Sequence, residues 1–321
     1  MSNSRVDKSV GGAGLQAGQK VYVSVATSAF SGATLLAFLL GAHPQIATVG
    51  EMDGLIASED PDEYLCSCGQ KITHCEFWQS VEKAMHAKGF EFSTANFGTR
   101  FVRRCPGLIQ SLRYGSSRNR LLDAARDAAF QAWPSERQAI ELLAARNTAF
   151  IQSVLRLTGK DIFLDTSKDR LRLKALHRYS GLDVRAIHWI RDVRGVVASR
   201  SRRRSDIDAY TAARDWVKLN QRLQITLQSL PRDRVTVARY EDLCQNVQPT
   251  LRRLHRFCGV DPSFETGNFG AVPQHIVGNS MRLGSVAKIV LDERWKSQLS
   301  EDQLREIDSA ARALRQRYGY T

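Results

Sequence analysis

The segment VYVSVATSAFSGATLLAFLLGA, residues 21–42, decides the fold of this 321-residue chain. Its first five residues are apolar or aromatic apart from Ser24, a pattern that predicts a buried strand. Small and polar residues over 26–33 predict a loop, and the apolar run over 34–42 predicts a helix that ends at His43-Pro44. A strand that passes through a loop of small residues into a helix is typical of α/β proteins.

The rest of the chain repeats this alternation of strand and helix. Short apolar runs predict further strands at 45–49, 161–165, 184–190 and 234–238. Amphipathic runs predict helices at 169–178, 193–204, 209–230 and 240–258. Such alternation implies right-handed crossovers and a covered parallel sheet. The predicted fold class is α/β, with a P-loop-like parallel sheet of about five strands and helices on both faces.

Two regions depart from the alternation. Residues 53–158 are irregular at first and then helical, with helices predicted at 76–88 and 121–157 and an interruption at Pro134. We interpret them as a mostly helical insertion within one domain that covers residues 20–321. Residues 1–19 are rich in glycine and serine and lack apolar periodicity, so a disordered tail is predicted.

The charge of the chain indicates an anionic partner. Its 46 basic and 33 acidic residues leave a net charge of +13. Nucleic acid, an acidic membrane surface and a small polyphosphate ligand would all satisfy this surplus. Residues 21–50 contain no charged side chain, but their hydroxyl groups and a central glycine fit a buried strand and helix better than a membrane span. We expect a cytoplasmic protein without a membrane span.

The loop after the first strand has the features of an anion site. A helix N-terminus exposes backbone N–H groups and the positive end of the helix dipole, Gly32 allows close approach, and Ser31 and Thr34 add hydroxyl donors. The nucleoside triphosphatase pattern G-x-x-x-x-G-K-[ST] is missing, and residues 21–70 contain no lysine. A tight turn that merely packs a helix on a sheet remains the alternative.

A second candidate site lies at the end of the strand at 184–190. Arg191 follows that strand directly, and Ser199 comes eight residues later, about two helical turns into the next helix. The carboxyl edge of an open α/β sheet is where ligands bind, and a guanidinium suits a phosphate. A surface ion pair of Arg191 with Asp192 that caps the helix is the structural alternative.

These segments together resemble the PAPS-dependent sulfotransferase family, in particular its bacterial members and the tyrosylprotein sulfotransferases. Each motif is weak alone, but their order along the chain is that of the family, and the similarity spans about residues 21–317. The matching stretches are Ser31-Gly32-Ala33-Thr34 through Gly50-Glu51, Asp165-Thr166-Ser167-Lys168, Arg191 to Ser199, Arg239-Tyr240-Glu241-Asp242-Leu243, and Gly278-Asn279-Ser280-Met281-Arg282 with Asp292-Glu293-Arg294-Trp295.

The resemblance implies how the chain would bind the co-substrate PAPS, 3′-phosphoadenosine 5′-phosphosulfate. Residues Ser31, Gly32, Ala33 and Thr34 would wrap the 5′-phosphosulfate. Arg191 and Ser199 would hold the 3′-phosphate, and Arg282 would close over that same phosphate.

The resemblance also indicates residues for catalysis. Sulfuryl transfer needs a base for the acceptor and a cation near the leaving PAP. Glu51 stands where the related enzymes keep their base, although their paired glutamate is replaced here by Met52, so Asp53 is an alternative base. Lys168 would neutralise the transferring group. His43, His188 or a base supplied by the substrate stay open.

One position departs from the family pattern. Most members have Lys or Arg before the Ser-Gly pair, where this chain has Phe30. A charge-assisted contact of about 1.5–3 kcal/mol is thereby missing. Three outcomes are open: compensation by Lys168 and another basic residue, slow turnover, or nucleotide binding without sulfuryl transfer. We favour compensation, because the other motifs are intact.

Two further patterns have an uncertain role. Cys66, Cys68 and Cys75, with the neighbouring His74, could form a zinc site or a disulfide, but adjacent His74 and Cys75 would share one ion with difficulty. We therefore predict packed thiols and no metal. The run Arg200-Ser201-Arg202-Arg203-Arg204 lacks the aromatic residues of a nucleic-acid site, so a solvated helix end near the anionic co-substrate is predicted, with no nucleic-acid partner.

The function predicted from the sequence is an enzyme, a PAPS-dependent sulfotransferase. It would move the sulfuryl group to a hydroxyl or amine of a small molecule, glycan or lipid and release PAP. A catalytically silent protein that binds PAP or another nucleotide is the alternative, and an ATP-dependent kinase is disfavoured by the missing loop lysine. The insertion at 53–158 would select the acceptor, which the sequence does not identify. A homodimer is compatible with the sequence.

Overall fold

The computed structural model describes residues 18–55, 59–101, 119–203, 206–267, 269, 272, 274–284 and 289–321. The predicted tail at 1–19 lies outside the described residues except for its last two positions. Arg204, the last residue of the basic run, also lies outside them.

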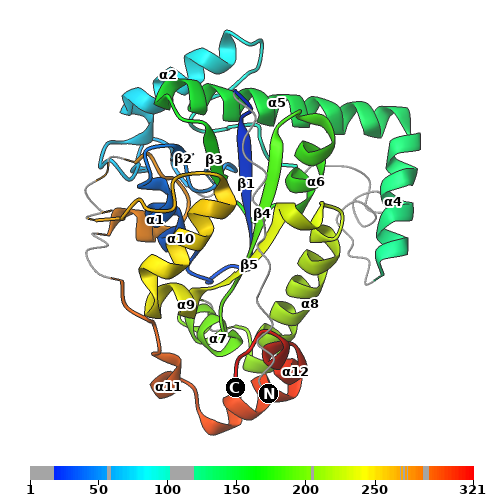
Figure 1. Ribbon diagram of the computed structural model, residues 1–321, viewed down its shortest axis with the longest axis vertical. Coiled ribbons are helices and arrows are strands. Elements are labelled where there is room, and N and C mark those ends of the chain that lie inside the picture. The colour runs from blue at the N-terminus through cyan, green and yellow to red at the C-terminus, as the bar shows by residue number, and fades with distance from the viewer. Residues whose placement is uncertain are drawn as a thin grey trace, which may run out of the picture.

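Five strands form one parallel sheet in the order β2-β3-β1-β4-β5 (Figure 1). The central strand β1 pairs with β3, where Val21 lies opposite Ile162, and with β4, where Val21 lies opposite Asp183. The predicted parallel sheet of about five strands is confirmed. The strands are β1 (Val21–Ala26), β2 (Ile46–Thr48), β3 (Ile162–Asp165), β4 (Asp183–Ile190) and β5 (Val235–Arg239).

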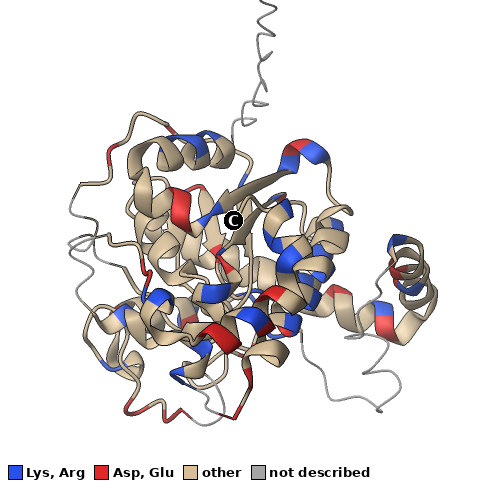
Figure 2. Ribbon diagram, turned by 90° about the horizontal axis from the view of Figure 1, so that it is seen from below, with Lys and Arg blue, Asp and Glu red and all other residues tan. Residues whose placement is uncertain are grey.

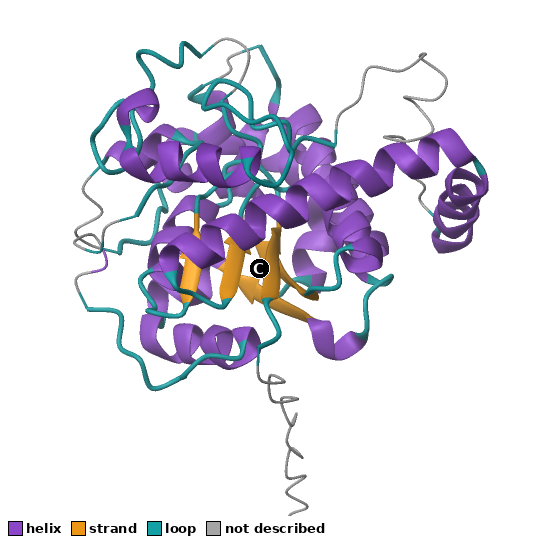
Figure 3. Ribbon diagram, turned by 90° about the horizontal axis from the view of Figure 1, so that it is seen from above, coloured by secondary structure: helices purple, strands orange, loops and turns teal. Residues whose placement is uncertain are grey.

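Helices cover both faces of this sheet (Figure 3). Val21, Val23 and Val25 point to one face, because alternate side chains of a strand lie on opposite sides, and there they share a core with α1 (Ala33–Gly41) and α10 (Val247–Cys258). Tyr22 and Ala26 point to the other face, into a core that includes residues of α8 (Ala209–Leu227) and of three further helices. These are α2 (Glu76–His86), α5 (Pro134–Thr158) and α6 (Arg170–Tyr179).

A third core lies beyond the carboxyl end of β4. Ile190 and Trp216 pack there with apolar residues of three helices. The helices are α7 (Val193–Ser201), α8 (Ala209–Leu227) and α12 (Glu301–Arg317). The sequence patterns predicted α7 and α8 to within a few residues, but not α12. Two short helices, α9 (Tyr240–Gln245) and α11 (Trp295–Gln298), follow β5 along the chain.

The single helix predicted at 240–258 is wrong, since α9 and α10 are separate. The chain breaks at Asn246, whose backbone leaves the helical region at φ −135° and ψ 67°. The break places Pro249 in the first turn of α10, where its missing N–H needs no partner within the helix. A continuous helix would instead carry this proline in its interior, where the ring clashes with the preceding turn.

The segment between β2 and β3 packs on the sheet. Trp78 of α2 and Phe150 of α5 lie in the same core as Phe163 of β3. The helix α5 begins at Pro134, as its sequence predicts, and α4 (Arg120–Ala132) precedes it. Figure 1 shows α5 crossing one end of the sheet, with α4 at its far end. The region predicted as an insertion therefore shares one core with the strands.

Candidate functional site

A cleft of about 640 Å³ lies at the carboxyl ends of the strands. The chain contributes a lining residue after each strand: residues 31–34 after β1, Glu51 after β2, Lys168 after β3, Arg191 after β4 and Tyr240 after β5. We call this the strand-end cleft. Ligands of open α/β sheets bind at this edge, because loops from several strands meet there.

The N-terminus of α1 faces this cleft as an uncapped helix end. Gly32 is its N-cap residue at φ 79°, and no side chain caps the helix. The Ser31 hydroxyl is buried and has no hydrogen-bond partner among the described residues. The indole of Trp189 donates to the Ser31 carbonyl over 2.9 Å and so fixes the loop. The unpaired N–H groups and the buried hydroxyl form a binding site for an anion.

Phe30 contributes backbone rather than charge to the cleft. Its φ of 61° is left-handed, which is uncommon for a residue with a side chain. Its ring packs against the core of α7, α8 and α12. Its carbonyl accepts a hydrogen bond from Arg191 over 3.0 Å. The structure therefore explains how an apolar residue is accommodated before Ser31.

Arg191 and Ser199 come together as their spacing predicts. Arg191 is 6% exposed, and its Nη1 donates to Ser199 Oγ over 3.4 Å. It also lies over the ring of Tyr240, with Cζ 4.6 Å from the ring centroid. Arg202, on the turn after α7, donates to the same Ser199 hydroxyl over 3.1 Å. Two guanidinium groups and a hydroxyl thus converge at one point of the cleft.

Asp292 places a carboxylate among these cations. Its Oδ2 accepts from Arg191 over 3.0 Å and lies 3.8 Å from Arg202, and its Oδ1 accepts from Arg294 over 2.7 Å. The hydrogen bond from Arg294, then that from Arg191, holds the pKa of Asp292 well below its usual range. The carboxylate thus binds to the cationic group as an anionic ligand would.

Glu51 and Lys168 form an ion pair inside the cleft. Lys168 Nζ donates to Glu51 Oε1 over 2.6 Å. The side chain of Lys168 is 24% exposed and that of Glu51 is 30% exposed. The ends of β2 and β3 are tied together because the Met52 N–H donates to Ser167 Oγ over 2.6 Å. Buried Asp165 in turn accepts from the Ser167 N–H over 2.8 Å. The predicted base, Glu51, and the predicted cation, Lys168, are therefore in direct contact within the cleft.

The other predicted site residues lie elsewhere. Asp53 does not line the cleft, because its carboxylate accepts from the fully buried Arg172. Arg282 does not line it either: its guanidinium donates to the carbonyls of Leu65 and Gly278, over 2.9 and 2.6 Å, and stacks on Tyr64.

Two histidines considered as bases are also remote from the cleft lining. His188 is buried and lies 3.2 Å from the amide oxygen of Asn220. His43 follows the C-terminal end of α1 and is buried beside His255, with ring centroids 4.9 Å apart. Neither histidine is among the residues that line the cleft.

Several cleft residues received no individual role from the sequence. Arg202 and Arg203 belong to the basic run that was predicted to lie near the anionic co-substrate, and both line the cleft. Asp292, Arg294 and Tyr240 lie in motifs that resemble the family, but nothing in their spacing predicted an ion-pair cluster around Arg191. Five cationic and three acidic side chains line the cleft, so its balance is positive.

Basic residues also occur on many other elements, interspersed with acidic ones (Figure 2). Among the described residues, no helix is long and apolar enough to cross a membrane.

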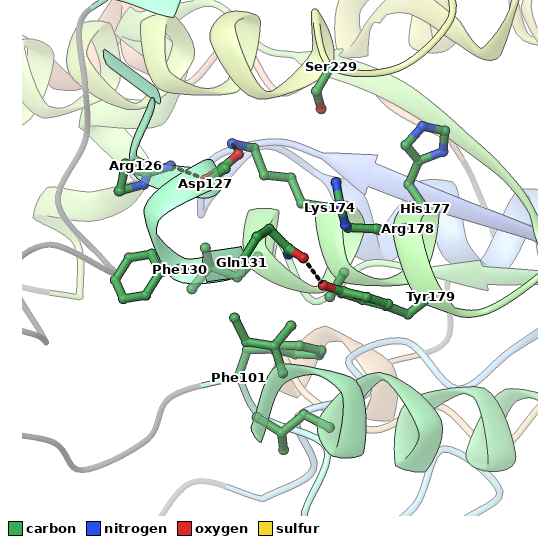
Figure 4. A pocket seen from close by; sticks show the side chains of 14 residues that line it. Phe101, Arg126, Asp127, Phe130, Gln131, Lys174, His177, Arg178, Tyr179 and Ser229 are labelled. Atoms are coloured by element: carbon green, nitrogen blue, oxygen red, sulfur yellow. Dashed lines mark hydrogen bonds and ion pairs between the residues drawn. The ribbon is translucent and has the colours of Figure 1, made fainter. Parts of the chain in front are cut away.

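A second cavity of about 350 Å³ lies between α4, α5 and α6 (Figure 4). Tyr179 donates to Gln131 over 2.7 Å at its wall, and Lys174 donates to Asp127 over 2.7 Å. No lining residue is shared with the strand-end cleft. The two cavities are therefore separate, and only the first is built from the strand ends.

Comparison with known proteins gives the family. A family model described as the sulfotransferase family matches residues 30–265, which include every strand after β1 and the residues 31–34, Glu51, Lys168 and Arg191. None of the curated proteins compared with the chain matches it.

Three sulfotransferases are among the solved structures that are similar to this one. The sulfotransferase domain from the curacin biosynthetic pathway is 16% identical, with a TM-score of 0.47 over 94% of this chain and 98% of that one. The domain from the Synechococcus PCC 7002 olefin synthase is 16% identical, with a TM-score of 0.46 over 91% and 94%. A sulfotransferase from Mycobacterium avium is 11% identical, with a TM-score of 0.45 over 94% and 78%. Because the family model matches most of the length of this chain, the chain belongs to the sulfotransferase family.

Proposed function

We propose that this protein transfers a sulfuryl group from PAPS to a hydroxyl or amine acceptor on a small molecule, glycan or lipid. One observation carries the proposal: an uncapped helix N-terminus and a pair of guanidinium groups on Ser199 open into the same cleft of about 640 Å³. A nucleotide with anionic groups at both its 5′ and 3′ ends needs two separate anion sites. Pockets of roughly 300–1,000 Å³ are typical for such ligands.

The residues of the cleft fit PAPS at both ends. The N–H groups at the start of α1, with the unpartnered Ser31 hydroxyl and Thr34, would hold the 5′-phosphosulfate. Arg191, Ser199 and Arg202 would hold the 3′-phosphate through charge-assisted hydrogen bonds. Asp292 now binds these cations, so a bound phosphate has to displace its carboxylate.

The chemical step needs a base and a cation at the sulfuryl group. The acceptor oxygen or nitrogen forms a bond to sulfur while the bond from sulfur to the bridging oxygen of PAP breaks. Glu51 takes the proton of the acceptor, and the Lys168 ammonium neutralises the charge that builds on the bridging oxygen. Glu51 is better placed than Asp53, because the Asp53 carboxylate is bound to Arg172.

Compensation for Phe30 has candidates in the cleft. Arg202, Arg203 and Lys168 supply cations there, although none occupies the position before Ser31. The alternative function, a silent protein that binds PAP, rests on the same Phe30. The acceptor would approach from the side of residues 53–158, which is where the predicted insertion adjoins Glu51.

The test compares nucleotides and then looks for transfer. PAP, PAPS, AMP and ATP are titrated into the protein by calorimetry, and PAP release is then followed with a library of hydroxyl and amine acceptors. Tight binding of PAP and PAPS together with acceptor-dependent PAP release is expected. Preference for ATP over PAP would refute the proposal, and PAP binding without transfer to any acceptor would favour the silent protein.

Arg191→Ala tests the 3′-phosphate site directly. Loss of one charge-assisted contact is expected to weaken PAP binding by more than about tenfold, with a smaller effect on AMP, which lacks the 3′-phosphate. Arg194→Ala is the matched control, because Arg194 starts the same helix but bonds to Asp192 outside the cleft. Equal losses of PAP and AMP affinity in Arg191→Ala would contradict the assignment.

A further inference from the structure

Four metal-ligand side chains meet away from the strand-end cleft. The sulfur atoms of Cys66, Cys68 and Cys75 and a ring nitrogen of His275 all lie within 4.8 Å of one another. The Sγ atoms of Cys68 and Cys75 are 3.7 Å apart. His275 Nδ1 lies 3.3 Å from Cys75 Sγ and 3.8 Å from Cys66 Sγ. No other such group of three or more residues occurs in the described part of the chain.

These separations match a tetrahedral zinc site. Zinc binds sulfur at about 2.3 Å and imidazole nitrogen at about 2.0–2.1 Å, so tetrahedral ligands lie about 3.8 Å apart for two sulfurs and about 3.6 Å for sulfur and nitrogen. The Sγ–Sγ separation and the two separations from sulfur to nitrogen fall within a few tenths of an ångström of these values. Van der Waals contact gives similar distances, so it is the convergence of three thiols and one imidazole at a single point that indicates a metal.

We propose that Cys66, Cys68, Cys75 and His275 bind one zinc ion in a closed structural site. Three soft thiolates with one imidazole select zinc, and four protein ligands leave no open position for catalysis. The sequence argued against a metal because His74 is adjacent to Cys75. In the structure His74 is exposed, and the fourth ligand comes from His275, 200 residues further along the chain.

The surrounding contacts hold the four ligands in place. The Gly69 N–H donates to the Cys66 carbonyl over 2.9 Å, which closes the turn that brings Cys68 back. The ring of Phe77 stacks on His275 at 4.4 Å between centroids and 6° between planes, and so orients the imidazole. Ser67 Oγ donates to the Gln274 carbonyl and accepts from the Ile276 N–H over 2.7 Å, which ties the two segments together on either side of His275.

The site would anchor a segment that adjoins the strand-end cleft. Val277 pairs with Gly50 in an isolated bridge, and a side chain at Gly278 would meet Glu51 Cγ at 2.8 Å. Three residues after His275, the chain therefore packs against Glu51, the proposed base. The inference on zinc itself does not depend on sulfuryl transfer, because its readouts are metal content and structure.

The first experiment measures metal in the untagged full-length protein. After purification without added metal, elemental analysis is expected to find about one zinc per chain. Replacement by Co²⁺ is expected to give the visible d–d bands and thiolate charge-transfer bands of a tetrahedral site. Protein that carries no zinc, takes up none and gives no cobalt spectrum would overturn the proposal. Loss of two titratable thiols in denatured protein without reductant would indicate a disulfide instead of a zinc site and would also overturn the proposal.

The second experiment compares matched variants. Cys68→Ser and His275→Ala are expected to lower zinc affinity in chelator competition by more than about tenfold. His74→Ala removes the neighbouring exposed histidine, and Cys258→Ala removes a buried thiol of α10, so both should retain about one zinc per chain. If His275→Ala binds zinc as tightly as His74→Ala, the proposed ligand set is wrong.

Hydrogen exchange on the wild-type protein is the control for variants that fail to fold. Cys68 is exposed, so its replacement removes little packing, but zinc loss itself loosens the site. Chelation is expected to accelerate exchange in residues 64–78 and 274–282, and zinc is expected to reverse it. Exchange that is unchanged in both segments would contradict a structural role.

Discussion

At the scale of single residues, the backbone at two positions points to the cleft. Phe30 and Lys168 are the residues other than glycine that have positive φ among those the structure describes. Such conformations cost of order 1–3 kcal/mol and are retained at functional sites when the surroundings enforce them. At Lys168 the conformation follows the turn fixed by Asp165 and Ser167, and it directs the ammonium group to Glu51.

Replacement of Lys168 should separate catalysis from binding. Lys168→Asn removes the ammonium group but tolerates the left-handed backbone. We expect kcat for PAP release to fall by about a hundredfold or more while the Kd of PAP changes by less than about threefold, because the charge it would stabilise develops in the transition state. The measurement is steady-state PAP release alongside calorimetry.

Lys71→Ala is the control for Lys168, since Lys71 pairs with Glu63 on the surface. It should leave both quantities unchanged. Equal losses of kcat and of PAP affinity in Lys168→Asn would show that Lys168 binds the donor rather than the transition state.

At the scale of elements, the start of α1 depends on a glycine for two reasons. Gly32 has a φ of 79°, and a Cβ there would lie 2.6 Å from the ring of Tyr240. Gly32→Ala is expected to lower the free energy of unfolding by more than the roughly 1–2 kcal/mol of a left-handed alanine. It should also weaken PAP binding, because the helix N-terminus has to move away from Tyr240. Urea unfolding and calorimetry measure the two effects.

Gly159→Ala is the matched control for this prediction. Gly159 has a φ of 66° at the end of α5, and nothing lies within 4 Å of a Cβ built there. Gly159→Ala therefore measures the free-energy cost of the left-handed backbone alone, without a steric clash. Equal destabilisation of the two variants would show that contact with Tyr240 has no role.

The segment before α11 supplies a competing anion. Asp292 binds Arg191 and Arg294, the first of which would hold the 3′-phosphate. Asp292→Asn is expected to tighten PAP binding severalfold, because a phosphate no longer has to displace a carboxylate. Glu293→Gln is the matched control. It also removes one negative charge from the cleft lining, but the Glu293 carboxylate pairs with Lys296 over 2.7 Å and not with Arg191. Weaker PAP binding in Asp292→Asn would mean that the carboxylate positions Arg191 instead.

At the scale of the whole molecule, the parallel sheet explains which site residues could be predicted. All five strands point the same way, so motifs that follow a strand meet at one edge. Ser31, Glu51, Lys168 and Arg191 each follow a strand, and all four line the cleft. The strand pattern alone indicates Ser31 and Arg191, whereas Glu51 and Lys168 are assigned to the site through the resemblance to the family.

Residues that depend on long-range packing could not be placed in this way. Asp53 follows β2 closely, yet it turns to the buried Arg172, whose side chain also binds Asp165. Asp292 and His275 lie in irregular segments with no periodicity to place them. Nothing in the spacing of the cysteines indicates a partner 200 residues away. Only the folded chain reveals such contacts.

Buried histidines make the stability of the whole molecule depend on pH. His188 on β4 is 3% exposed, and burial lowers its pKa to about 4, from a usual value of 6.5. Burial also lowers the pKa of His255 to about 4. Between these values the unfolded chain binds protons that the folded chain does not, so the free energy of unfolding falls as pH falls. The contribution of His188 is complete above pH 6.5 and lost towards pH 4.

The His188→Gln variant isolates this contribution. Urea unfolding of the wild type and the variant is measured from pH 8 to pH 4, and their difference is taken because the raised pKa values of Asp169 and Glu241 act in the opposite direction. The variant should lose up to about 3 kcal/mol less than the wild type over this range, since one buried imidazole no longer resists protonation. His74→Gln, which changes an exposed ring, should follow the wild type. If His188→Gln also does so, the fold does not lower the pKa of His188, because the Asn220 amide oxygen can accept a hydrogen bond from the protonated ring.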